Sequence, residues 1–280
     1  MKHLIIVRGG GEIASGVIHA LYRTGFRVLV LEQAEPTATR RRVAYSEAMY
    51  RGEATVERIT CYRAKNVEDA KRRLKEGQLV MLEDPEAKCV RGFKPQVLVD
   101  AMVAHENKGT KRDMAEHTVA LGPGFCAGRD VDVVVETGRG HNLGRLIYEG
   151  FSSKDQNLDN ATVGISQNVE HLVFAPENGR LEMLRSISLM VKQGESVAHL
   201  HTDDGQVIEL KATIDGVLRG ALHGGSRVRK GQKVADIHPT MGQEECFTIS
   251  DKARCIAGSV LEAVMVWDHK RPKRGFFQRH

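Results

Sequence analysis

The 280-residue sequence predicts an α/β fold, in which a mostly parallel sheet is followed by a small all-β domain and a C-terminal helix. Three observations lead to this prediction. Short apolar runs alternate with helical stretches at the start of the chain, an internal repeat follows, and an amphipathic stretch closes the sequence. We therefore divide the chain into a first domain (1–150), a polar linker (151–168), a β module (169–242), a C-terminal helix region (243–268) and a basic tail (269–280).

The first domain begins with a strand, a glycine turn, a helix and a second strand. Leu4–Val7 is an apolar run of the kind that forms a strand buried on both faces. Ile13, Val17 and Leu21 recur at helical spacing, and Val28–Leu31 returns to a strand pattern. This βαβ opening is typical of a Rossmann-like sheet. Further strands are predicted at Leu79–Leu82, Val97–Val99, Val119–Leu121 and Val131–Val135, and further helices at Val67–Lys75 and Asp100–Asn107.

The β module repeats itself at an offset of 37 residues, with Ala175 matching Ala212. Each copy has a Gly preceded by Asn or Asp, followed by the pattern V[KR]xGxxVA, which predicts short strands broken by glycine turns. The pattern resembles the two halves of a biotinyl or lipoyl-type barrel-sandwich hybrid domain. Such carrier domains hold a modified lysine between the halves. The join here has no lysine before Lys211, so a swinging-arm carrier is disfavoured.

The last structured stretch is predicted to be a single amphipathic helix. Ser250 suits an N-cap, and Asp251 lies in the predicted first turn, where a negative charge is favourable. Ala253, Ile256 and Val260 form an apolar face at helical spacing. We expect this face to pack against one of the two domains.

Charge and cysteine content limit the classes of partner and compartment. The net charge of +5 is confined to the tail after Asp268, because residues 1–268 sum to zero. We therefore expect no nucleic-acid partner and no membrane association. The five cysteines form no CxxC pair, and the only apolar run near the N-terminus is Leu4–Val7, too short for a signal peptide. These features predict a cytoplasmic protein.

A glycine turn follows the first predicted strand and matches the dinucleotide-binding pattern GxGxx[GA]. Gly9, Gly10, Gly11 and Ala14 begin the first helix, and Glu32 ends the next strand. Such a turn brings backbone N–H groups close to a pyrophosphate, and the acid can accept ribose hydroxyls. These five residues are the first predicted cofactor-binding set. A turn that binds nothing, or that binds another anionic cofactor, remains an alternative.

The segment from Leu121 to Arg145 contains two more glycine-dense loops. Gly122, Gly124, Arg139 and Arg145 are predicted to form a second wall of the cofactor site, since guanidinium groups bind phosphate and carboxylate. The alternative is ordinary turn chemistry. Arg40, Arg41 and Arg42 are a further group that either neutralises a phosphate or is solvated.

Three residues are candidates for catalysis. Cys126 suits a sulfur or selenium acceptor, His141 an acid or base, and Asp100 a group delivered to the sheet crevice by a buried strand. Each also has a structural alternative, namely a buried loop cysteine, a capping histidine and a helix cap. The sequence lacks HExxH, GxSxG and P-loop motifs, so no metal site is predicted.

Three strings, RGGGEIASGV, LGPGFCAGRDVDVVVETGRGHNLGRLIYEG and TISDKAR, together resemble the YqeB-type accessory proteins of the selenium-dependent molybdenum hydroxylase system. The resemblance implies a maturation factor that binds a nucleotide or a molybdenum-cofactor-like anion and assists sulfur or selenium insertion or cofactor delivery. The related XdhC-type proteins suggest a Rossmann domain that acts in these steps. The implied cofactor is a dinucleotide or a molybdopterin-type group, and the implied partners are a molybdenum hydroxylase and other maturation proteins.

Two other functions remain open at the level of sequence. Glu32 after the glycine turn also suits an NAD(P)-dependent oxidoreductase. The repeat also suits a non-enzymatic adaptor that uses the β module as its interaction surface. The sequence leaves the oligomeric state open.

Overall fold

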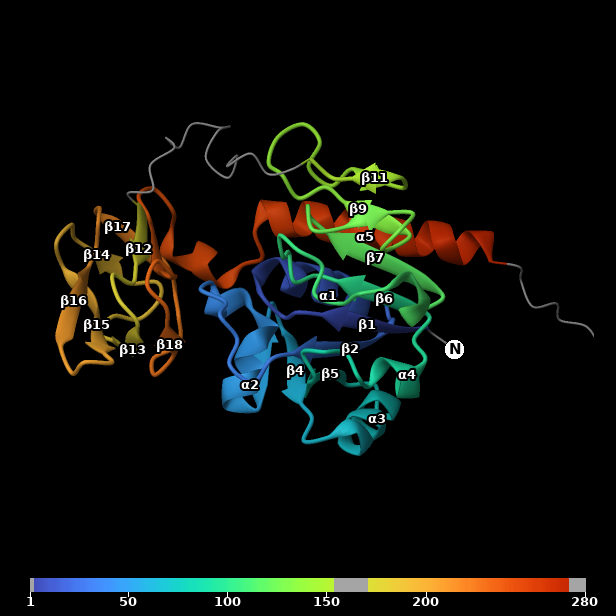
Figure 1. The fold of residues 1–280 in the computed structure, drawn as a ribbon, viewed down its shortest axis with the longest axis horizontal. Helices are drawn as coiled ribbons and strands as arrows, with labels where there is room; N and C mark the ends of the chain where they lie inside the picture. Colours follow the sequence, from blue (N-terminus) through green and yellow to red (C-terminus); the bar gives the residue numbers. More distant parts are fainter. Residues whose placement is uncertain (1–2, 154–170, 272–280) are drawn as a thin grey trace, which may run out of the picture.

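The computed structural model describes residues 3–153 and 171–271. Figure 1 shows a large sheet flanked by helices, with the β module at one end of the molecule. The predicted linker, apart from its first residues, and most of the basic tail (272–280) lie outside the described residues. Within the described residues, no helix has the length and apolar character needed to cross a membrane.

The large sheet has nine strands in the order β10-β9-β7-β6-β1-β2-β5-β4-β3. Its inner strands pair in parallel, whereas β10 pairs with β9, and β3 with β4, in antiparallel fashion. The chain moves outward from β1 through β2 and then returns to the other side of β1 as β6, so the connections reverse direction there. The strands are β1 (Leu4–Arg8), β2 (Arg27–Glu32), β3 (Glu53–Val56), β4 (Ile59–Arg63), β5 (Leu79–Glu83), β6 (Val97–Asp100), β7 (His117–Leu121), β9 (Val133–Val135) and β10 (Leu146–Ile147).

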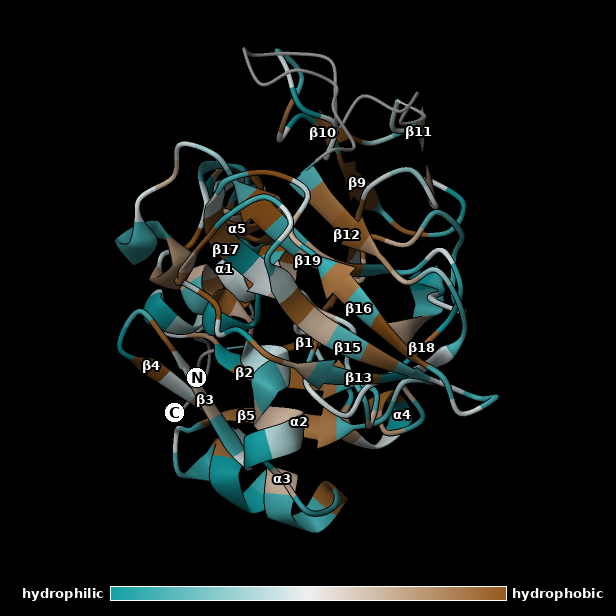
Figure 2. Ribbon diagram, turned by 90° about the vertical axis from the view of Figure 1, so that its left-hand side faces the viewer, coloured by the Kyte–Doolittle hydropathy of each residue, from teal (hydrophilic) through white to brown (hydrophobic). Residues whose placement is uncertain are grey.

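Helices cover both faces of this sheet. Helices α1 (Glu12–Arg23) and α5 (Asp251–Lys270) pack on one face and share its core with alternate residues of β1 and β2. Helices α3 (Val67–Lys75) and α4 (Val90–Phe93) cover the other face. Figure 2 shows α3 as mostly hydrophilic, and only its Ala70 and Leu74 are buried. The remaining short elements are α2 (Ala48–Arg51), β8 (Cys126–Ala127), β11 (Gly150–Phe151) and the 3₁₀ turns η1 (Arg41–Val43), η2 (Tyr45–Glu47), η3 (Arg112–Met114) and η6 (Gln243–Phe247).

The β module consists of two four-stranded antiparallel sheets, β12-β19-β17-β14 and β16-β15-β13-β18. Each copy of the repeat contributes strands to both sheets. The first copy places β13 and β15 in one sheet and the short β14 in the other, and the second copy places β17 and β19 in the sheet of β14 and the short β18 beside β13. Gly179 and Gly216 occupy matching positions, and a Cβ at either would clash with a backbone carbonyl of the opposite strand, at His201 and His238. The strands are β12 (Leu172–Phe174), β13 (Gly179–Met183), β14 (Met190–Val191), β15 (Ser196–Thr202), β16 (Val207–Lys211), β17 (Gly216–Ala221), β18 (Arg227–Val228) and β19 (Lys233–His238).

The predicted fold class, a Rossmann-like sheet followed by a barrel-sandwich-hybrid-like domain and a C-terminal helix, needs correction. The large sheet is mixed, with antiparallel strands at both edges, and it is accompanied by two four-stranded antiparallel sheets and by the two-stranded antiparallel pair of β8 and β11. The C-terminal helix returns to the large sheet and packs along α1 (Figure 1). The β3–β4 hairpin was missed because its turn uses Glu57 and Arg58 at positive φ, 42° and 72°, in place of Asn-Gly or Asp-Gly.

The helix predicted over Asp100–Asn107 is also wrong, since these residues form a loop after β6. The Asp100 carboxylate accepts a hydrogen bond from the Met102 backbone N–H, and Val103 has a φ of 53°. The Asp100 bond alone would suit a helix N-cap, but the positive φ of Val103 stops a helix from continuing. By contrast, the predicted N-cap of the last helix is confirmed, because the Ser250 hydroxyl accepts from the Ala253 N–H.

Helices α1 and α5 approach closely at Gly16. A Cβ there would lie 2.9 Å from the Ala253 carbonyl oxygen and 3.0 Å from its Cβ. We predict that Gly16→Val destabilises the protein by about 1–3 kcal/mol, because a β-branched side chain forces the helices apart. Urea denaturation measures the loss. Gly258→Ala on α5 is the control, because no atom lies within 4 Å of its added Cβ and it is expected to stabilise by up to about 1 kcal/mol. Equal stability of Gly16→Val and wild type would contradict this close crossing.

Candidate ligand-binding cleft

A cleft of about 550 Å³ lies where the strand connections reverse direction, at the carboxyl ends of the central parallel strands. This is where open α/β sheets generally bind ligands. The β1–α1 turn, the end of β2, the loop after β6, the segment 36–40 and the start of β19 all contribute to it. Its polar and glycine residues include Arg8, Gly9, Gly11, Glu12, Glu32, Thr39, Arg40, Gln232 and Lys233.

The three glycines after β1 are constrained to different degrees. Gly9 has a φ of +93°, and Gly10 leaves no room for a Cβ, which would lie 2.7 Å from the Met81 methyl carbon. Gly11 has an ordinary φ of −67°, and a Cβ there would have no neighbour within 4 Å. It is the N-cap of α1 and supplies no side-chain cap, so the first-turn N–H groups receive no capping side chain. Gly9, Gly11 and Ala14 line the cleft, as the sequence indicated, whereas Gly10 lies behind its wall.

Glu32 ends β2 and lines the cleft. Its two carboxylate oxygens accept hydrogen bonds from the Gly10 N–H at 2.8 Å and the Gln33 N–H at 2.9 Å. Burial raises the pKa of Glu32, and these two backbone donors oppose that shift. The carboxylate thereby holds the glycine turn against the end of β2. Each of its oxygens has a second lone pair that can accept a hydrogen bond from a ligand in the cleft.

Arg8 lines the cleft and forms a buried polar cluster with Asp100, which lies behind the lining. Arg8 is 2% exposed, and Asp100 is fully buried. The guanidinium donates to Asp100 at 3.5 Å, to the Thr110 hydroxyl at 2.5 Å and to the Pro85 carbonyl at 2.8 Å, and Thr110 also donates to Asp100. Burial raises the pKa of Asp100, while Thr110 and Arg8 favour its ionised form. The structure therefore places the predicted site residue Asp100 in a structural cluster behind the cleft lining, and the sequence did not single out its partner Arg8.

Besides Arg8, two cationic residues from other parts of the chain line the cleft, Arg40 and Lys233. Arg40 is 8% exposed and donates to the Glu12 carboxylate at 2.8 Å and to the Glu245 carbonyl at 3.1 Å, while its buried Nε has no partner. Lys233 comes from β19 of the β module, and its ammonium group makes no ion pair with any described residue. Arg40 is thus buried in a polar network, whereas the sequence favoured a solvated arginine; nothing in the sequence pointed to Lys233.

The segment that carries Arg40 also docks the β module. The Ala221 N–H donates to the Thr39 carbonyl at 2.9 Å, and Arg41 Nε donates to the Ala221 carbonyl at 2.8 Å. Nearby, the rings of Tyr50 and His223 stack with centroids 4.1 Å apart. One wall of the cleft is therefore also the contact between the large sheet and the β module.

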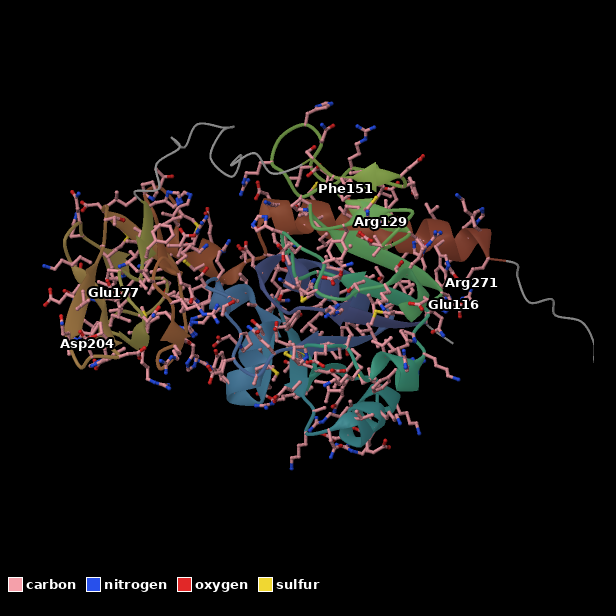
Figure 3. The ribbon with its side chains drawn as sticks, in the orientation of Figure 1. Glu116, Arg129, Phe151, Glu177, Asp204 and Arg271 are labelled. Carbon is pink, nitrogen blue, oxygen red and sulfur yellow. The ribbon has the colours of Figure 1, made fainter. Side chains whose placement is uncertain are left out.

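The second glycine-rich segment lies elsewhere. Gly122 and Gly124 pack against the loop after β6, with a Gly124 Cβ only 2.5 Å from the Ala104 carbonyl oxygen. Arg145 lines a separate cavity of about 440 Å³ near Tyr148 and Phe151. Figure 3 shows Phe151 beside Arg129, well away from the β module, and their cation–π distance is 5.5 Å.

The other predicted residues of that segment do not join the cleft lining either. Arg139 forms a long ion pair with Asp251, at 3.9 Å. Cys126 pairs with Phe151 in a two-stranded sheet, and His141 is an exposed loop residue. The structure therefore does not bring these side chains to the first glycine turn. Among residues 3–153 and 171–271, no group of three or more histidine, cysteine or acidic side chains is arranged to hold a metal ion.

Comparisons with known proteins give one sequence relative. No protein-family model matches the chain. The chain is similar to the uncharacterized protein YqeB of Escherichia coli (strain K12), with 38% identity over 270 residues that cover 96% of this chain and 49% of that protein. The chain thus spans about half the length of this relative.

The chain also matches several solved structures at low sequence identity. The ectoine utilization protein EutE (DoeB) from Ruegeria pomeroyi is 16% identical, with 86% of each chain covered and a TM-score of 0.28. An aspartoacylase family protein from Mesorhizobium loti and a succinylglutamate desuccinylase/aspartoacylase from Rhodobacter sphaeroides are 10% and 14% identical, each with 86% of both chains covered and a TM-score of 0.29. At this similarity they assign no activity to the chain.

These comparisons correct the XdhC relationship and the role that the YqeB-type resemblance implied. The curated relative is uncharacterized, and the similar structures named above are desuccinylase-type and ectoine utilization proteins, not XdhC-type proteins. None of them links the chain to molybdenum or selenium. The prediction of a molybdenum hydroxylase maturation factor is therefore wrong, and the comparisons do not support the oxidoreductase and adaptor alternatives either.

Removing Asp100 leaves Arg8 buried without its counter-charge. We predict that Asp100→Ala lowers the free energy of unfolding by about 3–5 kcal/mol. The double variant Arg8→Met/Asp100→Leu is expected to lose much less, since no unpaired charge stays buried. Urea denaturation of both variants checks this, and a single-variant loss no larger than that of the double variant would contradict the role of the pair.

The raised pKa of Glu32 predicts a pH dependence of stability. The folded protein binds this proton more tightly than the unfolded chain, whose Glu pKa is about 4.5. The contribution of Glu32 is therefore fully present below pH 4.5 and is lost as the pH rises through its folded pKa. Glu32→Gln should remove this dependence, so its stability relative to wild type should increase from pH 4 to pH 7 in urea titrations. A constant difference over that range would contradict the shift.

Proposed function

We propose that this protein binds a small anionic metabolite in the cleft between the large sheet and the β module. The observation that carries the proposal is Lys233, which forms no ion pair within the described part of the chain and lines the same cleft as the uncapped N-terminus of α1. An unpaired cation, exposed backbone donors and the positive end of a helix dipole all favour a bound anion. Phosphate and carboxylate groups are the anions that such donors recognise.

Two further features support a ligand at this position. Arg40 is buried, lines the cleft and has an Nε without a hydrogen-bond partner. Buried polar atoms in proteins are nearly always satisfied, so an orphaned donor beside a cleft is expected where a ligand or a water completes the site. Gly11 has open space beside it, because an added Cβ would have no neighbour within 4 Å.

The size and composition of the cleft favour a compact ligand. A volume of about 550 Å³ lies within the usual range for small-molecule sites. Glu32 offers acceptor oxygens to ligand hydroxyl groups on the side of the glycine turn. Because Lys233 belongs to the β module, a ligand that contacts both Lys233 and α1 would hold the two parts of the protein together.

Gly11→Asp provides a selective test. We predict that it abolishes anion binding, because the new carboxylate occupies the helix N-terminus. Stability should stay the same or rise by a few tenths of a kcal/mol, because Asp is a better N-cap than Gly and the position has open space and an ordinary φ. Calorimetric titration with inorganic phosphate and glycerol 3-phosphate, together with urea denaturation, measures both effects.

Gly258→Asp is the matched control, since it adds the same charge at an open position of α5 outside the cleft. It should bind these probes like wild type. If neither phosphate nor glycerol 3-phosphate binds the wild-type protein, or if Gly11→Asp binds them unchanged, the proposed site is wrong.

Lys233→Gln tests the contribution of the β module. Loss of a charge-assisted hydrogen bond is expected to weaken binding by roughly 1.5–3 kcal/mol, which is about tenfold or more. Lys211→Gln on β16 is the control, because Lys211 is more than half exposed and pairs with Glu209 instead. Equal titration curves for the two variants would exclude Lys233 from the site.

A further inference from the structure

Of the described residues, five charged ones line the cleft, and three of these are neutralised by partners within the protein. Arg8 pairs with the buried Asp100 at 3.5 Å. Arg40 and Glu12 both line the cleft and pair with each other at 2.8 Å. These three residues therefore leave no net charge for a ligand, and the charge that a ligand meets comes from the other two.

Glu32 and Lys233 are the other two charged lining residues, and they belong to different parts of the protein. Glu32 ends β2 of the large sheet, whereas Lys233 begins β19 of the β module. Neither forms an ion pair with a described residue, and they do not pair with each other. The cleft therefore has one carboxylate and one ammonium group that are not compensated by the described protein.

The Glu32 carboxylate is held in place, but its charge is not balanced. Its oxygens accept hydrogen bonds from the Gly10 and Gln33 N–H groups, at 2.8 Å and 2.9 Å. Burial raises the pKa of Glu32, and these backbone donors oppose the shift without help from a described cation. Withdrawing a carboxylate from water is costly unless a cation pairs with it. A ligand that pairs only with Lys233 would leave this cost in place.

We propose that the ligand carries an ammonium group in addition to its anionic group, and that Glu32 binds the ammonium while Lys233 and the N-terminus of α1 bind the anion. This inference rests on the anion site proposed above. Glu32 acts as a specificity-determining residue, because an ammonium group compensates its charge and a hydroxyl group does not. Small aminophosphates and amino acids share this chemistry.

Two matched pairs of ligands test this selectivity by calorimetric titration at neutral pH. Phosphoethanolamine is compared with 2-hydroxyethyl phosphate, and β-alanine with 3-hydroxypropionate. Within each pair the anionic group is the same and an ammonium group replaces a hydroxyl group, so the contribution of the anion largely cancels. The wild-type protein should bind the amino compound of at least one pair about fivefold or more tightly than its hydroxyl partner, because opposite charges attract strongly in a site withdrawn from water. The pair that shows the larger preference distinguishes an aminophosphate from an amino acid.

Glu32→Gln keeps an oxygen that can accept a hydrogen bond but removes the charge. It should weaken the amino compound about fivefold or more and leave the hydroxyl compound bound as in wild type or more tightly, so that the preference is lost. Binding of the hydroxyl compound also reports that the variant is folded. Glu83→Gln is the control, because Glu83 lies opposite Glu32 on β5 but pairs with Arg63 and does not line the cleft. It should keep the preference of wild type.

The outcomes separate this inference from the anion site itself. If the wild-type protein binds these compounds without preferring the amino compound in either pair, the role of Glu32 is overturned while the anion site stands. The same holds if Glu32→Gln shifts both compounds of the preferred pair equally. If none of the four compounds binds the wild-type protein, the anion site is wrong.

Discussion

The buried pair of Arg8 and Asp100 holds together the part of the sheet on which the cleft depends. It joins the ends of β1 and β6, the two strands between which the connections reverse direction, and the Arg8 donors also reach the Pro85 and Lys108 carbonyls. A charge buried this deeply is stable only with complete partners, so the pair constrains the loops after three strands at once. The glycine turn above it is thereby held in one position.

The segment 39–41 gives the cleft its second constraint. Thr39 and Arg41 bond to Ala221 of the β module, while Arg40 turns toward the cleft and Glu12. Docking of the β module and shaping of the anion site therefore use neighbouring residues of one short segment. A change in the hydrogen bonds of Arg40 would affect both the docking of the β module and the shape of the anion site. Ligand binding in the cleft is therefore coupled to the position of the module.

Local elements could be predicted from the sequence to different extents. The opening strand, helix and second strand, and the capped helix after Ser250, follow from periodicity and end signals that act over a few residues. The β3–β4 hairpin and the loop after Asp100 could not be predicted this way. The hairpin turns on Glu57 and Arg58, and the loop depends on a carboxylate that bonds to Met102, Thr110 and Arg8. The predicted molybdenum and selenium role rested on resemblance, and the comparisons do not support it.

By itself, the sequence determined the glycine turn with Glu32 at the next strand end, and the repeat that builds the β module, because both depend on spacing along the chain. Only the tertiary structure decided which charged groups meet at that turn. In the structure, Arg40 and Lys233 line the cleft, and Asp100 lies behind its lining. The lining does not include Arg139, Arg145, Cys126 or His141. The physical reason is that charge pairing and burial depend on packing between segments far apart in sequence. Such contacts cannot be predicted from the spacing of residues along the chain.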